Sequence, residues 1–483
     1  MGVHSLDKRE IEIPRGTAKQ VLSLAQIAVL TGLLLPLTVS LVIDFHTTAL
    51  VCIALTLLFM ILFVGLKLVL WCISPRNGFG TSVADLDDLE DNAPLYTILV
   101  PMYHEAHMIP LLLRNISQMR YPWERLQIIL LLEEKDTETQ EAAQWQIMQS
   151  GAFGDACQIA VVPEAWKELP QGKPRALNYG LELARGRYLT IYDAEDKPEK
   201  DQLLKAVAGF NRSADNVACL QAALRFWNEA HSILTRFYRA EYYVHFMWIL
   251  PGLARLGLIL PLGGTSNHFK TQVLREVGGW DPYNVTEDAD MAGALALYGF
   301  AVQSFDSWTD EEASRHLRPA DKQRRRWLKG YVMTGLVYTR HPIIYAREMG
   351  VRRWFFYNLF MLGTPFCLII NPFFWAMTIA WPITGSPVIT HLWPLPLYVT
   401  GMVLMIIGDC LLFYQMVFAC LYQDGFSSLK YMLLLPFWWL FTSTSSWMML
   451  PELAVKPHHW NKTRHVGEDS DKEGSLETAI PIT

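Results

Sequence analysis

The feature that most constrains the fold is a run of 55 residues, Trp354 to Gly408, with no charged side chain. Two shorter charge-free runs lie near the start of the chain, 24 residues from Gln20 to Ile43 and 19 residues from Thr48 to Leu66. A helix of about 20 apolar residues crosses the hydrocarbon core of a bilayer. Each run is long enough to do so, and the sequence therefore predicts a membrane protein.

The two N-terminal runs have basic side chains on their outer sides, namely Lys8, Arg9, Arg15 and Lys19 before them, and Lys67 and Arg76 after them. Lys and Arg are enriched in cytoplasmic flanks, and only a few residues separate the runs. We therefore expect a hairpin with both ends in the cytoplasm. The first run is too long for the apolar core of a signal peptide, so we expect an uncleaved anchor.

The apolar runs near the C-terminus predict three membrane spans, or four if the long run folds back at Asn371-Pro372. The two further runs are Cys410 to Gln423 and Tyr431 to Pro451. The tail after them opens basic and ends acidic, which favours a cytoplasmic segment that is disordered beyond about residue 467. A cytoplasmic tail requires an even number of spans after the cytoplasmic domain, whereas the clear apolar runs number three. Three and four spans therefore both stay open at this point.

The polar middle of the chain alternates strand-like runs with helical stretches. The strand-like runs are "YTILVPMY" (96–103), "LQIILLLEE" (126–134), "QIAVVPEA" (158–165), "RYLTIYDAED" (187–196) and "VACLQAALRF" (217–226). This alternation indicates βαβ units and a mostly parallel sheet. The predicted division is a cytoplasmic N-terminus (1–19), a transmembrane hairpin (20–75), an α/β cytoplasmic domain (76–353), a C-terminal membrane block (354–456) and a tail (457–483).

Composition excludes some functions. The net charge of −6 argues against a nucleic-acid-binding protein, because such domains are usually basic over a whole face. The seven cysteines include no pair with CxxC spacing, so neither a disulfide framework nor a zinc site is indicated.

Acidic groups follow three of the predicted strands. They are Glu105 after the first, Glu133, Glu134 and Asp136 after the second, and Asp193, Glu195 and Asp196 after the fourth. Ligands of parallel sheets bind at the carboxyl ends of strands, so these groups are expected to share one crevice. Mg²⁺ and Mn²⁺ take oxygen ligands, usually one or two carboxylates plus substrate phosphates. An isolated acidic tripeptide such as "DAED" is more often a solvated turn.

Three later motifs each have two interpretations. In "YNVTEDADMAGALALYGF" (283–300), Asp288 is either a helix cap or a catalytic carboxylate. In "QRRRW" (323–327), the arginines are either a basic membrane flank or part of a site. The loop "GGTSNHF" (263–269) is either a helix-capping turn or a binding wall.

Taken in order, "VPMYHE", "EEKD", "GKPRALN", "DAED", "GGTSNHF", "TED" and "QRRRW" resemble the motif series of family 2 glycosyltransferases with the GT-A fold. The chain is most similar to the membrane-embedded processive synthases of cellulose, curdlan and hyaluronan. The resemblance covers residues 95–330 and extends to the membrane helices on both sides. It implies a Rossmann-like GT-A catalytic domain inserted between N-terminal and C-terminal transmembrane helices.

The resemblance also implies roles for individual residues. The residues placed against the nucleotide sugar are Pro101, Tyr103, Glu105, Glu133, Glu134, Lys173, Asp193, Gln323 and Arg326. Asp193, Glu195 and Asp196 are the implied ligands of Mg²⁺ or Mn²⁺. The implied acceptor contacts are Thr265, Ser266, Asn267 and Trp327, and the implied general base is Asp288. Arg324 and Arg325 are expected to serve only as a basic membrane flank.

The activity implied is inverting transfer from a UDP-sugar, UDP-glucose first, onto a growing β-linked polysaccharide that crosses the plasma (inner) membrane. UDP-GlcNAc and GDP-mannose stay open as donors. A non-processive transfer to a lipid carrier and an inactive membrane receptor or transporter are the alternatives. The apolar segment 242–262 is expected to lie on the bilayer as a pair of interfacial helices. Asp409 should face protein, water or polymer, and Trp375, Trp381, Trp438, Trp439 and Trp447 are candidates for lining a sugar path.

Overall fold

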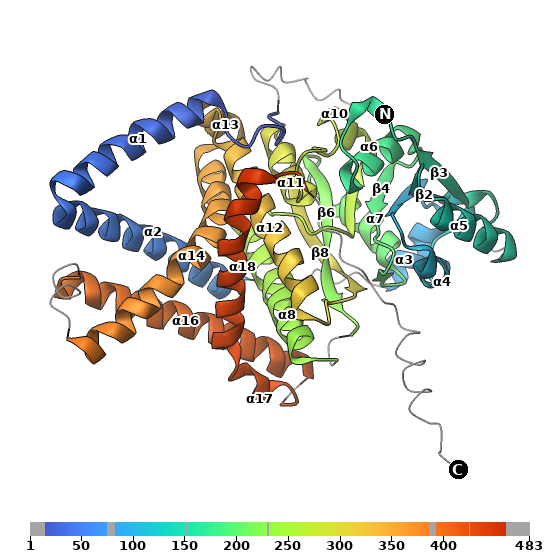
Figure 1. Cartoon of the computed structure of the whole chain (residues 1–483). Helices are drawn as coiled ribbons and strands as arrows, with labels where there is room; N and C mark the ends of the chain where they lie inside the picture. The colour runs from blue at the N-terminus through green and yellow to red at the C-terminus, as the bar shows by residue number, and fades with distance from the viewer. Residues whose placement is uncertain are drawn as a thin grey trace, which may run out of the picture.

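A computed structural model describes residues 15–74, 83–150, 153–228, 231–385, 393–424 and 426–459. Figure 1 shows an α/β domain on one side of the molecule and long helices on the other. The tail from residue 460 onward lies outside the described residues, as do Lys8, Arg9 and Arg76.

The domain is built on a sheet with strand order β3-β2-β1-β4-β7-β6-β8-β5. The strands are β1 Tyr96–Met102, β2 Leu126–Glu133, β3 Cys157–Val162, β4 Tyr188–Ile191, β5 Lys197–Pro198, β6 Val217–Phe226, β7 Asn267–Lys270 and β8 Ala301–Glu311. Strands β3, β2, β1 and β4 are parallel neighbours, and β6 pairs parallel with β8. The expected mostly parallel sheet is confirmed. β7 is antiparallel to both β4 and β6, and β5, β7 and β8 are additional to the five predicted strands.

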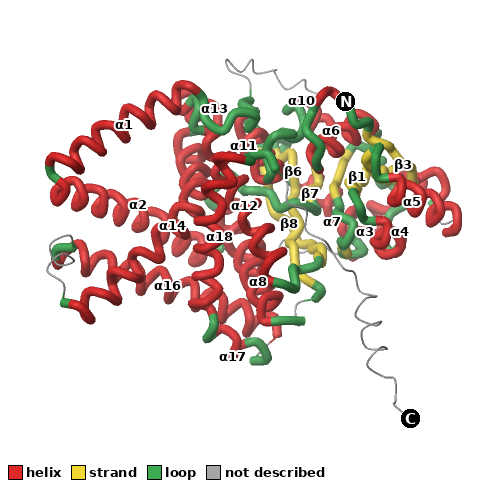
Figure 2. Tube along the Cα trace, viewed as in Figure 1, coloured by secondary structure: helices red, strands yellow, loops and turns green. Residues whose placement is uncertain are grey.

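Both faces of the central strands are apolar because both are covered by helices. In β1, Ile98 and Val100 point into the core under one helical layer, whereas Leu99 points into the other. The first layer consists of α3 Val83–Asp91, α4 Ile109–Ser117, α5 Thr137–Ser150 and α7 Gln202–Arg212. The second contains α6 Lys173–Leu183, α8 Ile233–Val244, α9 Leu250–Arg255, α10 Thr271–Glu276, α11 Glu287–Leu297, α12 Leu317–Tyr338 and α13 Pro342–Met349. Figure 2 shows these helices on either side of the strands.

Four described helices are long and apolar enough to cross a membrane, namely α1 Leu24–Ile43, α2 Phe45–Ile73, α14 Val351–Thr384 and α16 Leu395–Asp424. The expected hairpin is present as α1 and α2, joined at Asp44. The short helix α17 Leu429–Met432 and the longer α18 Leu435–Val455 follow. The buried side of α18 contains Thr442, Ser443, Ser445 and Ser446, and Ser445 bonds to Asp321 of α12 at 2.7 Å. This helix therefore packs on the α/β domain through polar contacts.

The predicted fold-back at Asn371-Pro372 is wrong. Helix α14 continues through Pro365, Pro372 and Pro382 and ends only at Thr384, where Gly385 takes a left-handed conformation with φ of 55°. Pro is tolerated inside membrane helices because neighbouring helices and local adjustments satisfy the freed backbone groups. Left-handed glycine is a common helix terminator.

The segment 242–262 is not a pair of helices. Instead, α8, a π-helical turn (His245–Ile249) and α9 form one continuous helical stretch that ends before Gly257, whose φ is 62°. It packs against α2, where the rings of Trp248 and Trp71 stack with centroids 4.2 Å apart. Gly252 allows the close approach, because a Cβ there would lie 2.8 Å from the Leu70 carbonyl oxygen. It is not among the four candidate spans.

Residues just before α1 attach the hairpin of α1 and α2 to the α/β domain. The Arg15 guanidinium pairs with the fully buried carboxylate of Asp290 on α11 and donates to the Gly279 carbonyl at 2.6 Å. The backbone N–H of Ala18 donates to Asp281, and Arg340 donates to the Thr17 carbonyl at 2.6 Å. Burial raises the pKa of Asp290 to about 6, although Arg15 opposes the shift.

We expect Arg15→Met to destabilise the protein strongly, because it leaves the Asp290 carboxylate buried without its cation. Removing one partner of a buried pair costs about 3–5 kcal/mol. Thermal unfolding of the detergent-solubilised chain should show a clearly lower Tm, and adding Asp290→Asn should recover most of the loss. Lys135→Met, which breaks the exposed pair with Glu164, is the matched control and should change little. Equal Tm values for Arg15→Met and Lys135→Met would contradict the expectation.

Candidate active site

One cavity of about 780 Å³ runs from the carboxyl ends of the strands to the membrane helices. Most of the residues singled out in the sequence line it, namely Pro101, Tyr103, Glu105, Glu133, Lys173, Asp193, Glu195, Asp288, Gln323, Arg326 and Trp327. They come from the ends of β1 and β2, from the loop after β4, and from α6, α11 and α12. Side chains separated by more than 200 residues thus face a single space.

Lys173 joins the two acidic sides of this cavity. It begins α6, and its ammonium pairs with Asp193 and donates to the Gly264 carbonyl oxygen at 2.8 Å. A Cβ on Gly264 would lie 3.5 Å from the Asp288 carboxylate, so Asp193 and Asp288 flank the same lysine. Burial by itself lowers the pKa of Lys173, but Asp193 and Glu287 raise it overall. The lysine is therefore a firmly charged cation.

The "DAED" carboxylates fall into two environments. Asp193 and Glu195 line the cavity, whereas Asp196 is 1% exposed and accepts hydrogen bonds from the Thr265 hydroxyl and the Asp193 N–H. The assignment of all three as metal ligands needs correction for Asp196, because it is turned into the protein. Burial, followed by the nearby Asp193 charge, raises the pKa of Glu195 well above its usual range.

The carboxylates of Asp193 and Glu195 fit a hard divalent cation whose other ligands are phosphate oxygens of the substrate. Among the described residues no group of three or more His, Cys, Asp or Glu side chains forms a complete metal cage. Mg²⁺ and Mn²⁺ need only one or two protein carboxylates when substrate phosphates supply the rest. Asp193 and Glu195 provide these, and the buried Oδ1 of Asp196 has no hydrogen-bond partner beside them.

A further carboxylate enters from a strand that the sequence reading missed. Glu311 ends β8 and lines the cavity. Burial, then the charges of Asp196 and Asp193, raises the pKa of Glu311 well above its usual range. The acidic run "TDEEAS" (309–314) contains this residue. Because the sequence did not predict β8 as a strand, it did not predict that Glu311 lies near Asp193.

Helix α11 begins with two cavity-lining carboxylates, Glu287 and Asp288. One Asp288 oxygen accepts the Ala289 N–H at 2.8 Å. Burial, followed by the Asp288 charge, raises the pKa of Glu287 to about 7, although Lys173 and Arg326 oppose the shift. Burial also raises the pKa of Asp288. Thr286 precedes this helix, and its side chain makes no cap hydrogen bond.

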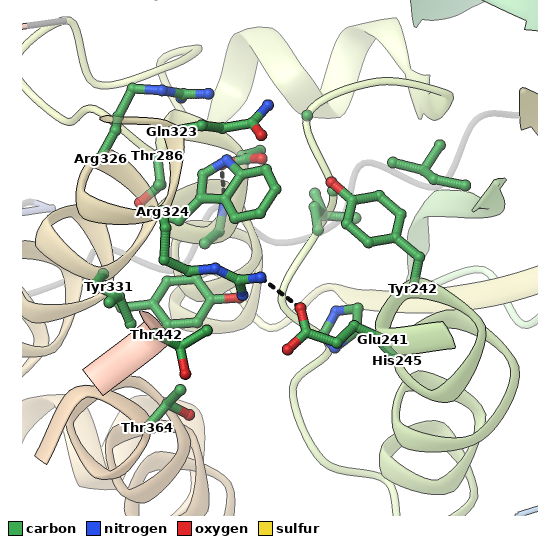
Figure 3. Close-up of a pocket in the computed structure, with 18 of the residues that line it drawn as sticks. Glu241, Tyr242, His245, Thr286, Gln323, Arg324, Arg326, Tyr331, Thr364 and Thr442 are labelled. Atoms are coloured by element: carbon green, nitrogen blue, oxygen red, sulfur yellow. Dashed lines mark hydrogen bonds and ion pairs between the residues drawn. The ribbon is translucent and has the colours of Figure 1, made fainter. Parts of the chain in front are cut away.

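Helix α12 lies against the start of α11 and presents Gln323, Arg326 and Trp327 to the cavity. The approach depends on Gly330, because any Cβ there would overlap the Thr286 side chain. Arg326 donates to the Val285 carbonyl at 3.0 Å, which fixes the guanidinium beside Glu287 and Asp288. Figure 3 shows Gln323 and Arg326 on one side of this pocket.

The other two arginines of "QRRRW" are not only a basic flank. Arg324 lines the cavity and pairs with Glu241 of α8, as the dashed line in Figure 3 shows. Arg325 pairs with Asp321 on its own helix and with Glu452 of α18. The expectation that both residues serve only as a flank is therefore wrong, because each attaches α12 to another helix.

The "GGTSNHF" loop contributes backbone to the cavity rather than side chains. Gly263 and Gly264 line it, whereas Thr265, Ser266 and Asn267 are at most 1% exposed. The Thr265 hydroxyl oxygen lies 2.9 Å from the Ile191 carbonyl oxygen, Ser266 bonds to Thr309 at 2.5 Å, and Asn267 donates to the Gly263 carbonyl at 2.8 Å. The predicted acceptor contacts by these three side chains are therefore not available in this structure.

The two glutamates after β2 point in different directions. Glu133 lines the cavity and forms a buried pair with Arg175 of the "GKPRALN" motif. Glu134 is exposed and accepts the Glu164 N–H at 2.7 Å, so its predicted place at the nucleotide is not supported. After β1, His104 has a positive φ of 53° and its N–H donates to Asp136, which holds the neighbouring Tyr103 and Glu105 at the cavity.

The far part of the cavity lies among helices that can span a membrane. Its polar lining there includes Lys67 of α2, Asn371 of α14, and Asp409 and Gln415 of α16. Asp409 thus faces a cavity, as expected of a carboxylate in an apolar helix. Of the five tryptophans proposed for a sugar path, only Trp439 lines this cavity.

Comparison with known proteins is consistent with this geometry. The family model "Glycosyltransferase like family 2" matches residues 93–330. A probable glycosyltransferase of Bacillus subtilis, YdaM, is 25% identical over 49% of this chain and 55% of its own length. The beta-monoglucosyldiacylglycerol synthase of Trichormus variabilis is 25% identical over 57% of this chain and 56% of that protein. A probable glucomannan 4-beta-mannosyltransferase of Oryza sativa is 25% identical over 49% of this chain and 43% of that protein.

The matches thus span about half the length of these relatives. Among solved structures, the mannosyltransferase PcManGT from Pyrobaculum calidifontis, in complex with GDP-Man and Mn²⁺, aligns with a TM-score of 0.50 and 20% identity. The alignment covers 82% of this chain and 97% of that one, and establishes a shared fold. Residues 93–330 are therefore a glycosyltransferase family 2 domain with the GT-A fold, with helices on both sides that are long and apolar enough to span a membrane.

Proposed function

We propose that this protein transfers a sugar, with inversion, from a nucleotide-sugar donor to an acceptor hydroxyl at the cytoplasmic face of the plasma membrane. The observation behind the proposal is that Lys173 lies between Asp193 and Gly264, whose Cα is next to Asp288. A site for the diphosphate and a site for the general base therefore adjoin. The basic residues Arg352 and Arg353 at the start of α14 support the cytoplasmic orientation of the domain.

In the proposed reaction, the Asp288 carboxylate takes the proton of the acceptor hydroxyl as its oxygen attacks the anomeric carbon. The bond from that carbon to the diphosphate breaks on the opposite side, so an α-linked donor gives a β-linked product. Lys173 and Arg326 offer positive charge to the departing diphosphate. A divalent cation, Mg²⁺ or Mn²⁺, held by Asp193 and Glu195, would neutralise further charge on this leaving group.

For donor and product we propose UDP-glucose and a β-linked polysaccharide that leaves through the membrane part of the cavity. The cavity continues from Asp288 to Lys67, Asn371 and Asp409, which gives a glycan polar contacts among the helices. The "QRRRW" motif, by its resemblance to the processive synthases, supports repeated addition. Trp327 lines the cavity where a terminal sugar could stack its C–H face on the indole ring.

A second candidate is transfer of one sugar to a lipid acceptor. Much of the cavity wall formed by α2, α14 and α16 is aliphatic, including Val64, Leu368, Leu404 and Leu411, which suits an acyl or prenyl chain. The relative from Trichormus variabilis is named for a lipid product. Membranes incubated with labelled UDP-glucose or GDP-mannose and Mn²⁺ or Mg²⁺ would separate the candidates. Label in a glycanase-sensitive polymer supports the first, and label in the organic extract supports the second.

Asp288→Asn should lower the rate of sugar transfer by about 100-fold or more, because an amide cannot accept the acceptor's proton. Binding of UDP with the metal should persist, since Lys173 and Asp193 are unchanged. Asp306→Asn, which alters an exposed aspartate on β8, is the matched control and should leave both measurements unchanged. A full transfer rate in Asp288→Asn would eliminate the proposed base.

Transfer should slow as the pH falls from about 8 to 6. The base works deprotonated, and burial raises the pKa of Glu287 to about 7 and also raises that of Asp288, so acid protonates this pair in that range. In Glu287→Gln, the neighbouring negative charge is absent, and the acidic limb of the pH–rate profile should move to lower pH. A profile that is flat from pH 8 to 6 in the wild type would contradict this account.

A further inference from the structure

The ion pair between Glu241 and Arg324 joins three helices at the wall of the cavity. Glu241, on α8, accepts one hydrogen bond from the Arg324 guanidinium of α12 and another, at 2.8 Å, from the indole N–H of Trp438 on α18. Both members of the pair line the cavity. Figure 3 shows the bond crossing the view between Gln323 and Arg326 on one side and Thr364 and Thr442 on the other.

Arg324 is also enclosed by aromatic rings. Its guanidinium carbon lies 5.3 Å from the ring centroid of Tyr238, 5.4 Å from that of Trp327 and 5.1 Å from that of Trp438. A planar cation stacks well on aromatic faces, and such contacts strengthen when they are shielded from water. The orientation of the Trp327 indole is therefore coupled to the position of Arg324.

The remaining neighbours of Trp327 restrict it further. Tyr238 meets its ring nearly edge-on, with centroids 6.2 Å apart and an interplanar angle of 83°, and Tyr242 is tilted against it at 6.1 Å. Tyr238, Glu241 and Tyr242 all belong to α8, one turn before the π-helical turn at His245–Ile249. The helix that supplies Glu241 is thus also the one that packs around the indole.

The ion pair makes no contact with the groups proposed to hold the diphosphate. Lys173, Asp193 and Glu195 belong to α6 and to the loop after β4, whereas the ion pair belongs to α8 and α12. Arg326 is also on α12, but its guanidinium is held by the Val285 carbonyl. Changes in the pair should therefore act on the acceptor and leave the donor in place.

We propose that Glu241 and Arg324 are acceptor-positioning residues: as a pair they hold Trp327 in the orientation that stacks on the acceptor's terminal sugar. The proposal rests on the proposed function and specifies how its acceptor site is built. The acceptor class that fits is a β-linked hexopyranose chain, whose apolar C–H face lies on the indole. The pair does not touch the reacting atoms, and its effect is on acceptor binding.

The test uses the full chain purified in detergent and a short β-linked gluco-oligosaccharide as the acceptor probe. Direct binding of this probe and, separately, hydrolysis of UDP-glucose without acceptor would be measured with Mn²⁺ present. Arg324→Gln and Glu241→Gln should each weaken oligosaccharide binding by about tenfold, the effect of losing one good contact of this kind. Hydrolysis of the donor by water should stay within about twofold of the wild type, because donor groups are untouched.

Arg325→Gln is the matched control, since Arg325 is the next residue on α12, forms ion pairs with Asp321 and Glu452, and does not line the cavity. It should bind the oligosaccharide as the wild type does. The double variant Glu241→Gln with Arg324→Gln should bind no worse than either single variant, because both act through one pair. Arg324→Lys keeps the positive charge but not the planar group, so its affinity for the oligosaccharide should lie between those of the wild type and Arg324→Gln. It replaces Arg324→Gln in the test if that variant does not fold.

Wild-type oligosaccharide binding in Arg324→Gln, or a loss as large in Arg325→Gln, would overturn the proposal. So would a parallel fall in donor hydrolysis, because the pair would then support the whole domain. The wild-type chain could bind the oligosaccharide but neither transfer nor hydrolyse a nucleotide sugar. This result would distinguish the proposed function from the proposed role of the Glu241–Arg324 pair. In that case the proposed function fails, whereas the variants still decide the role of the pair.

Discussion

The placement of Lys173 between the Asp193 carboxylate and the Gly264 carbonyl is the interaction on which the rest of the site depends. Around this ammonium the fold gathers an excess of carboxylates, namely Glu105, Asp193, Glu195, Glu287, Asp288 and Glu311. A nucleoside diphosphate is itself an anion, so this cavity would repel it without further positive charge. Burial, followed by the charges of neighbouring carboxylates, raises the pKa values of Glu195 and Glu311 well above their usual range. In the proposed reaction, a divalent cation bound together with the diphosphate would offset these negative charges.

The membrane helices and the catalytic domain share one cavity because several helices belong to both. The stretch from α8 through α9 packs on α2 by the Trp71–Trp248 stack, and its inner side supplies Glu241, Tyr242 and His245 to the cavity. From the opposite direction, Arg15 holds α11 by Asp290, two residues from Asp288. A displacement of the hairpin in the bilayer would therefore also displace the start of α11. The close approach at Gly252 fixes α9 against α2, and the close approach at Gly330 fixes α12 against Thr286, just before α11.

Sequence reasoning predicted those parts of the site that local pattern determines. The parallel strands, the hairpin, and the convergence of Glu105, Glu133 and Asp193 follow from strand ends and apolar runs that can be read along the chain. The place of Asp288 in the site was implied only by the resemblance to family 2 glycosyltransferases. Sequence reasoning failed where tertiary contacts decide a side chain's direction. Thr265 bonds to one oxygen of Asp196 inside the protein, and Glu134 faces solvent one residue after Glu133 faces the cavity. β7 is only four residues long, and β8 alternates polar side chains, so neither gave an apolar signal.

The three consecutive arginines show why a basic run next to a membrane cannot be interpreted from charge alone. Successive residues of a helix point about 100° apart, so Arg324, Arg325 and Arg326 face three different neighbours. Arg324 meets Glu241 of α8, Arg325 meets Glu452 of α18, and Arg326 meets the Val285 carbonyl just before α11. Their positions therefore fix α12 against an acceptor-side helix, a C-terminal helix and the helix that presents Asp288. A membrane flank would need the positive charges but not these partners, and a substitution by lysine would preserve a flank while losing the planar geometry that the stacked Arg324 uses.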